Sequence, residues 1–501
     1  MKIQPEWLTA IDPRRRFCQV ARLASARWPT RMPGRSAAAL CALLLTACTS
    51  LLPPTQVPMQ VAPAWQAALP HQGSVTSLSD WWQQQGDPLL VELIAAAQQV
   101  SPSVAQALAR IEAARASQAA AHAALLPGLN AQASASRGIS QPDVPMATTL
   151  QAGLQASWEL DLVGANRAVS QAAQAQVESS QAQWHDARVS VAAEVANRYY
   201  SLTSCRQQLL LAQGNARSQQ ETNRLSAVSA NAGLLAPAVA AMARASAAEA
   251  DSRVTQQAAG CALDAKALVA LSAIAEPDLS QKLPPALMGS AQPAIFSIAS
   301  LPARTVSQRP DVFAAERDVV LASAQVGSAR ARQWPRLTLN GSIGRLRLDQ
   351  GSQTTDLSTW SFGPLALSLP LFDAGQRAAD VQAALAGYQS TVLAYQGRVR
   401  QAVREVEEAL VNLHSSQART QHAQLVTQAY AESLTASQSR FDQGLASLPE
   451  LEEARRSALA AESARLALSL ERQRAWVALY RAAGGGFEPD KLASAASAAQ
   501  P

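Results

Sequence analysis

Apolar and polar residues alternate strictly along two neighbouring stretches of the chain. From Leu150 to Leu162 every even position is apolar, whereas every odd position is polar or glycine. The same alternation runs from Leu129 to Ser136, and residues 140–145 between them carry turn-forming Ser, Pro and Asp. A period of two residues predicts β-strands, so this region (about 128–162) is expected to form a hairpin of two strands.

The second half of the chain repeats this pattern. Leu337–Ile343 alternates, and Trp360–Leu371 follows after a loop rich in Gly, Ser and Asp. This predicts a second hairpin at about 336–371. Strands of about 11–13 residues have the length of tilted strands that cross a membrane.

Long segments without helix breakers follow each predicted hairpin. Ala165–Ala230 and Gln376–Phe441 each contain 66 residues and no proline; a short turn and 39 further proline-free residues follow in both copies. Because Gly164 and Gly375 lie 211 residues apart, as do Gly233 and Gly444, the two halves are read as a duplication. Each half predicts a helical hairpin (about 165–276 and 376–488), with a first helix about 100 Å long.

The expected fold class is therefore mixed α+β and mainly α, with four strands and two long helical hairpins in each chain. Four strands cannot close a barrel in lipid, because open edges leave backbone groups unpaired. Two copies would supply eight strands packed solid with side chains, and three would supply twelve around a lumen. The alternative is a soluble four-stranded sheet that caps a helical bundle.

Composition and charge restrict the possible functions. Aromatic residues make up only 5% of the chain, which favours helices that approach closely through small side chains. The net charge of +5 is concentrated in residues 1–47, which hold eight Lys or Arg against two acids, or +6. The remainder is close to neutral, so the basic balance is no evidence for nucleic-acid binding.

The N-terminus has the pattern of a secretory leader. A basic segment precedes the apolar run Ala37–Ala47, which is too short to span a bilayer. Leu45-Thr46-Ala47-Cys48 resembles a bacterial lipobox, so Cys48 is expected to be lipidated and Thr49 favours the outer membrane; the alternative is an ordinary signal peptide. Translation could start at Met1 or at Met32. No stretch of 18 apolar residues follows Cys48, and the segment after it is expected to be a flexible tether.

Several separated motifs resemble the outer-membrane factors of tripartite efflux systems, in the lipoprotein branch of the TolC/OprM/NodT type. The resemblance runs from about Trp81 to Gly486. Its motifs include Asp80-Trp81-Trp82, Trp158-Glu159-Leu160-Asp161-Leu162, Arg309-Pro310-Asp311, Leu371-Phe372-Asp373-Ala374-Gly375 and Phe441-Asp442-Gln443-Gly444. It implies a homotrimer with a 12-stranded barrel in the outer membrane of a Gram-negative bacterium, continued by a 12-helix tunnel and girdled by an equatorial belt.

The resemblance also implies function and partners. The chain is expected to be a passive exit duct for small molecules or drugs, joined through a periplasmic adaptor to an inner-membrane transporter of the RND, MFS or ABC class. The helical tips at Gly233, Leu234, Gly444 and Leu445 would contact the adaptor. A type I secretion component and a structural envelope lipoprotein without a pore remain as alternatives.

The resemblance places a periplasmic gate of acidic residues after the second helical turn, at Glu450, Glu452 and Glu453. Three copies of a carboxylate around a narrow axis would repel one another and attract cations. The position of Glu453 best matches the usual acid of the family. The alternative is a solvated helix face beside Arg455 and Arg456.

Two cysteines remain after the leader and Cys48, and each lies 28 residues from Gly233. Equal distances from a turn bring residues level in an antiparallel hairpin, so Cys205 and Cys261 are expected to form a disulfide in the oxidising periplasm. Two free thiols are the alternative.

No catalytic motif, cofactor motif or metal-ligand spacing occurs among the five histidines and the carboxylates, so no enzyme activity and no cofactor are expected. The expected organisation is a signal peptide (1–47), the tether (48–77), a first repeat (78–276), an equatorial linker (277–303), a second repeat (304–488) and a C-terminal tail (489–501).

Overall fold

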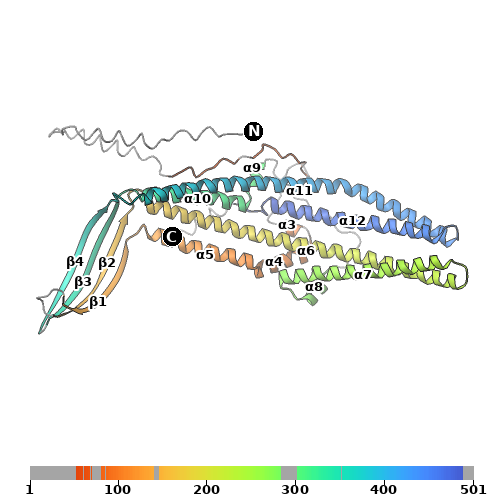
Figure 1. Cartoon of the computed structure of the whole chain (residues 1–501), viewed down its shortest axis with the longest axis horizontal. Coiled ribbons are helices and arrows are strands. Elements are labelled where there is room, and N and C mark those ends of the chain that lie inside the picture. Colours follow the sequence, from red (N-terminus) through yellow and green to blue (C-terminus); the bar gives the residue numbers. More distant parts are fainter. Residues whose placement is uncertain are drawn as a thin grey trace. The chain divides into compact units, whose positions relative to one another are not determined.

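The computed structural model describes residues 52–59, 61–67, 69, 81–84, 86–139, 146–283, 302–350 and 352–488, without the side chains of 302–304. The leader, Cys48, most of the equatorial linker and the C-terminal tail lie outside these residues. Within them the protein is mainly helical with one small sheet, as the sequence predicts (Figure 1).

The sheet contains the two predicted hairpins side by side. Strands β1 (Gly128–Gly138), β2 (Ala147–Leu160), β3 (Arg336–Gln350) and β4 (Gln353–Ser368) are antiparallel and lie in sequence order. The two halves of the chain meet where Gly153 faces Gly344, and a Cβ on either glycine would lie under 3 Å from a backbone oxygen of the other strand. The second hairpin pairs further than its alternation predicts, because β3 continues to Gln350 and β4 begins at Gln353.

Nothing in the described chain covers the faces of this sheet. Every residue of β1 is exposed, and on β4 Trp360 and Phe362 are 78% and 83% exposed. No described strand pairs with the outer edges of β1 and β4. The sheet therefore does not cap a helical bundle of its own chain.

Two long helices carry the architecture. Helices α6 (Ala165–Asn231) and α11 (Gln376–Asp442) have 67 residues each, and they turn back into α7 (Pro237–Ser272) and α12 (Leu448–Ala482). The sheet lies at one end of α6 and α11 and the two helical turns at the other (Figure 1). No single described helix is apolar and long enough to cross a membrane; α7 and α8 (Glu276–Lys282), taken together as a bent pair, meet the criteria of length and composition.

Shorter helices pack against the two long helices. Helix α5 (Pro102–Ala123) packs on α6, and α10 (Pro310–Ala331) packs between α6 and α11. Helix α12 also packs against both α6 and α11, so α10 and α12 occupy the same gap from opposite ends. Helices α3 (Trp81–Gln84), α4 (Pro88–Val100) and α9 (Pro302–Ser307) lie near the middle of the long helices, at the level where α10 and α12 approach each other (Figure 1).

The largest side chains of the core lie at this level as well. Trp81 is 1% exposed and stacks on Tyr480 at a centroid distance of 4.9 Å. The Tyr199 hydroxyl donates a 2.6 Å hydrogen bond to Asp87, which also caps α4. On α6 just over half of the buried residues are Ala or Ser, whereas the buried residues of α11 are mostly Val and Leu.

The segment expected to be a flexible tether is packed in its described part, which we call the N-terminal strap (52–59 and 61–67). Trp65 is 9% exposed, and the backbone N–H groups of Gln66 and Ala67 donate to the two oxygens of Glu407 at 2.7 and 2.8 Å. Tyr388 donates to the Pro54 carbonyl at 2.8 Å. The expectation missed this docking because a carboxylate 340 residues away satisfies the backbone donors.

Candidate functional site

The two helical tips are built in the same way. At the end of α6, Gly233 is left-handed with φ 75°, and the N–H of Leu234 donates to the Ser229 carbonyl at 2.9 Å. At the end of α11, Gly444 also has φ 75°, and the N–H of Leu445 donates to the Arg440 carbonyl at 2.7 Å. A left-handed residue followed by this hydrogen bond is the Schellman cap, for which glycine is best suited.

Each tip presents one apolar side chain to solvent. Leu234 is 82% exposed and Leu445 is 65% exposed. The four residues expected at the tips are therefore placed equivalently on the two hairpins, with a leucine accessible at each.

The three acids of the expected gate have different surroundings. Glu450 forms a capping box with Ser447, accepting the Ser447 N–H at 3.0 Å, and so closes the start of α12. Glu452 is 6% exposed. The side chain of Glu453 is 67% exposed, and its ion pair among the described residues is with Arg456 on the same helix, at 2.6 Å.

Glu452 belongs to a buried polar cluster that ties the second hairpin to the first. It accepts hydrogen bonds from Gln219 of α6 and, at 2.8 Å, from Arg455. Arg455 also donates to Thr222 of α6 at 2.5 Å and to Gln438 of α11 at 2.8 Å. We call Gln219, Thr222, Gln438, Glu452 and Arg455 the hairpin latch, because three helices meet in it.

Cys205 and Cys261 are joined by a disulfide between α6 and α7, with their Cα atoms 5.5 Å apart. The buried pair lies well behind the tip, since 28 residues of helix correspond to about 42 Å. The second hairpin has no cysteine, and Ser416 and Arg472 stand 28 residues either side of Gly444.

We expect both cysteines to be oxidised in protein matured in the periplasm, and Cys205→Ser to lower the free energy of unfolding by about 2–4 kcal/mol by freeing the loop between them. Non-reducing peptide mapping and urea unfolding measure the two quantities. Finding both thiols free in matured protein would end this assignment. The reduced parent is the matched control, since it should unfold as readily as the variant.

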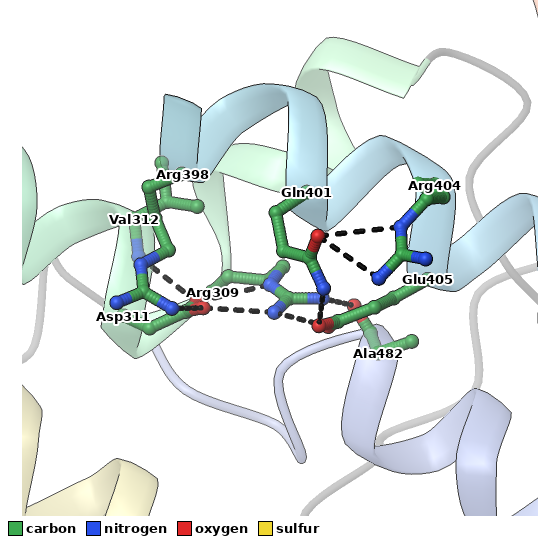
Figure 2. A network of polar contacts seen from close by, with 8 residues as sticks. All are labelled: Arg309, Asp311, Val312, Arg398, Gln401, Arg404, Glu405 and Ala482. Carbon is green, nitrogen blue, oxygen red and sulfur yellow. Dashed lines mark hydrogen bonds and ion pairs between the residues drawn. The ribbon is translucent and has the colours of Figure 1, made fainter. Parts of the chain in front are cut away.

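A second polar cluster, the arginine junction, lies where the end of α12 meets the start of α10 (Figure 2). Arg309 is 5% exposed and donates to the Ala482 carbonyl at 3.0 Å, to Glu405 at 2.7 Å and to both oxygens of Asp311 at 2.9 and 2.8 Å. The cation thus meets the negative end of α12, and Asp311 lies at the positive end of α10.

The arginine junction shifts the pKa values of two aspartates in opposite directions. Burial alone would raise the pKa of Asp311, but the hydrogen bonds and charge of Arg309 outweigh it, and the pKa lies below its ordinary value. Nearby Asp186 of α6 has a raised pKa, because burial and the charge of Asp311 oppose its ionisation more than the surrounding arginines favour it.

A turn of three glycines brings the end of α12 against this junction. Gly484, Gly485 and Gly486 all have positive φ, and a Cβ at Gly484 would overlap the Gln308 carbonyl oxygen. The sequence motif containing Arg309, Pro310 and Asp311 marked this region. The sequence did not indicate that Arg309 would pair with Glu405 and the Ala482 carbonyl, or Arg455 with Thr222, because these partners lie far apart along the chain.

Comparison with known proteins agrees with this geometry. The model of the outer membrane efflux protein family matches residues 93–273 and 301–485. The chain is 32% identical over 473 residues to outer membrane protein OprJ of Pseudomonas aeruginosa, covering 90% of this chain and 95% of OprJ. A crystal structure of a membrane protein from Pseudomonas aeruginosa superposes with a TM-score of 0.76 at 28% identity, covering 87% of this chain and 100% of that one. The open state of the Neisseria gonorrhoeae MtrE outer membrane channel gives 0.73 at 26% identity, covering 87% and 98%.

The chain therefore belongs to the outer membrane efflux protein family, and the resemblance inferred from its motifs is confirmed. It is the outer-membrane channel component of an efflux system in Gram-negative bacteria, and its family is one of channels.

Proposed function

We propose that three copies of this chain form a passive duct that carries small molecules from a periplasmic adaptor and an inner-membrane transporter to the exterior. The observation that carries the proposal is the sheet, with its exposed faces and its unpaired β1 and β4 edges. Hydrogen bonding between β1 of one copy and β4 of the next removes every edge, and twelve strands leave room for a lumen.

The helical tips are the proposed contact with the adaptor. Leu234 and Leu445 are exposed on capped turns, so their apolar side chains are available to a partner without disturbing the helices. The proposed source of energy is the inner-membrane transporter, since the family of this chain is one of outer-membrane channels. We propose no catalytic role for this chain.

Among the three acids, Glu453 is the one proposed to line the constriction. Glu450 caps α12 and Glu452 pairs with Arg455 inside the hairpin latch, which leaves Glu453 with an exposed carboxylate. Replacing Glu453 by Gln in all three chains should lower the cation selectivity of the reconstituted pore, since one ring of charge is lost. Reversal potentials across a KCl gradient measure it. Glu462→Gln, further along α12, is the control, and an unchanged selectivity in both variants excludes Glu453.

The proposed membrane anchor is a lipid on Cys48, supported by the basic leader, the short apolar run and the Leu45-Thr46-Ala47-Cys48 string. Intact mass and N-terminal peptide mapping of mature protein should find a diacylglyceryl cysteine that is also N-acylated. An unmodified N-terminus downstream of Cys48 contradicts the anchor without contradicting the duct.

The cellular experiment uses ethidium as a transported dye. Deleting the gene should raise ethidium accumulation in cells that express the cognate adaptor and transporter, and the parent gene should restore export. A variant with Leu234 and Leu445 both changed to Asp should reach the outer membrane but fail to restore it. Unchanged accumulation on deletion in a strain with no other outer-membrane efflux channel would count against export through this duct.

A further inference from the structure

Two neighbouring hollows flank the arginine junction. The larger, of about 880 Å³, lies between α6, α11 and the last turns of α12, and the smaller, of about 270 Å³, lies between α6, α11 and the start of α10. Glu405 and Arg481 line both. The two hollows therefore form one polar depression across the point where α12 meets α10.

This depression faces away from the N-terminal strap. Glu407 holds the strap, whereas Glu405 and Asn412 of the same helix line the larger hollow. At 3.6 residues per turn these two lie about 160° and 140° around α11 from Glu407. A strap that leads to a lipid anchor must run outside a tube, so the depression lies on the lumen wall. This step rests on the proposed function.

Three acids and three arginines line the larger hollow, but two of the acids pair with arginines that do not line it. Its carboxylates Glu405 and Glu408 are committed, Glu405 to Arg309 at 2.7 Å and Glu408 to Arg404 at 3.2 Å. Arg474 and Arg481 are exposed, and among the described residues neither has a carboxylate oxygen within 4 Å. Arg481 does act on Asp186 across the smaller hollow.

Two further polar residues of the larger hollow are Arg198 and Asn197. Arg198 lies at the edge, 3.9 Å from Asp264, and the Oδ1 atom of Asn197 is buried without a hydrogen-bond partner in the described chain. Glu194 is the one remaining acid of the lining, so the uncommitted charge of the hollow is positive.

We propose that the larger hollow, lined by Arg474 and Arg481, is a binding subsite for carboxylate or phosphate groups of molecules that move through the duct. Arg474 and Arg481 stand seven residues apart, two turns or about 10 Å along one face of α12, so their guanidinium groups can hold the two ends of one polyanion. Guanidinium groups bind such anions through paired N–H bonds. Three chains would place three such subsites around the lumen, at the level of the arginine junction.

Citrate is the probe, titrated into the detergent-solubilised oligomer by isothermal calorimetry at low salt. The parent should bind one citrate per chain, and the affinity should fall as salt is added. The double variant R474Q/R481Q should bind at least about tenfold more weakly, because two charge-assisted contacts are lost. R474K, which keeps the charge, should retain more affinity than R474Q.

The matched control is R400Q, because Arg400 is an exposed arginine of α11 about 20° from Glu407, on the strap side. It should leave citrate binding unchanged. A parent that binds no citrate, or an R400Q variant that loses as much affinity as the double variant, overturns the subsite. Conductance of the same preparations reports on the duct separately, so a pore that conducts but binds no citrate refutes only the subsite.

Discussion

Arg309→Met is expected to lower the free energy of unfolding by about 3–5 kcal/mol, which is the usual cost of removing one partner from a buried ion pair. Arg309 is 5% exposed and binds three groups from three segments: Asp311, Glu405 and the Ala482 carbonyl. Its removal leaves the buried Asp311 carboxylate with the more distant Arg398, at 3.9 Å, and leaves the C-terminal end of α12 without a cation. The midpoint of urea unfolding in mild detergent measures the change.

Arg404→Met is the matched control, because its side chain is 59% exposed and pairs with Glu408 on the same helix. Exposed pairs contribute about 0–1 kcal/mol.

The two variants should also differ in acid. Since the pKa of Asp311 is depressed in the folded protein, its stabilising contribution is present above the unfolded value of about 3.9 and is lost as the pH falls through the lower folded value. The penalty of Arg309→Met should therefore shrink below about pH 4. An equal effect of both variants at neutral pH contradicts a special role for the arginine junction.

Arg455→Met should have a comparable cost in stability and, in addition, change the pore. The Arg455 side chain is 13% exposed and that of Glu452 is 8% exposed, so the substitution leaves a buried carboxylate unpaired, at about 3–5 kcal/mol. It also removes the donors to Thr222 and Gln438, which join the second hairpin to the first and to its own outgoing helix. The disulfide stiffens only the first hairpin, so the second is the one expected to move outward.

Single-channel recording should therefore show larger or longer openings of the Arg455→Met pore than of the parent. Arg224→Met is the control in the same region. Arg224 pairs with Glu221 within α6, so this ion pair does not join two helices. If Arg455→Met unfolds more easily but conducts like the parent, the hairpin latch stabilises the fold but does not keep the pore closed.

The sequence predicted the elements well because each has a local physical cause. Alternation predicted β2 at 150–162 and the structure has it at Ala147–Leu160, since a strand between two environments shows its period directly. Glycine and proline fix the ends of the long helices, which lie within one residue of the predicted 165–230 and 376–441. The ends of β3 and β4 were missed because their outer parts pair through backbone bonds beyond the alternating segment.

The contacts that hold the elements together could not be predicted in the same way. Arg455 meets Thr222 across 233 residues and Glu407 meets Ala67 across 340, and neither pair has a local pattern. A Cβ at Gly485, just after α12, would strike Val189 of α6, and no local pattern indicates this close approach. Burial distinguishes Glu452 from Glu453, and the capping box distinguishes Glu450 from Glu453, whereas the sequence alone shows three acids within four residues.

The most direct test of the duct is the mass and conductance of one purified fraction. Multi-angle light scattering in mild detergent, corrected for bound detergent, should give three chains per particle, and the same fraction should form pores in a planar bilayer. A proline at Ser358 of β4 should abolish both together. Because Gln350 pairs with Gln353 across a two-residue turn, the alternating register points the Ser358 N–H away from β3, toward the edge that would have to pair with β1 of a neighbour. A preparation that conducts as a single chain would contradict closure between copies.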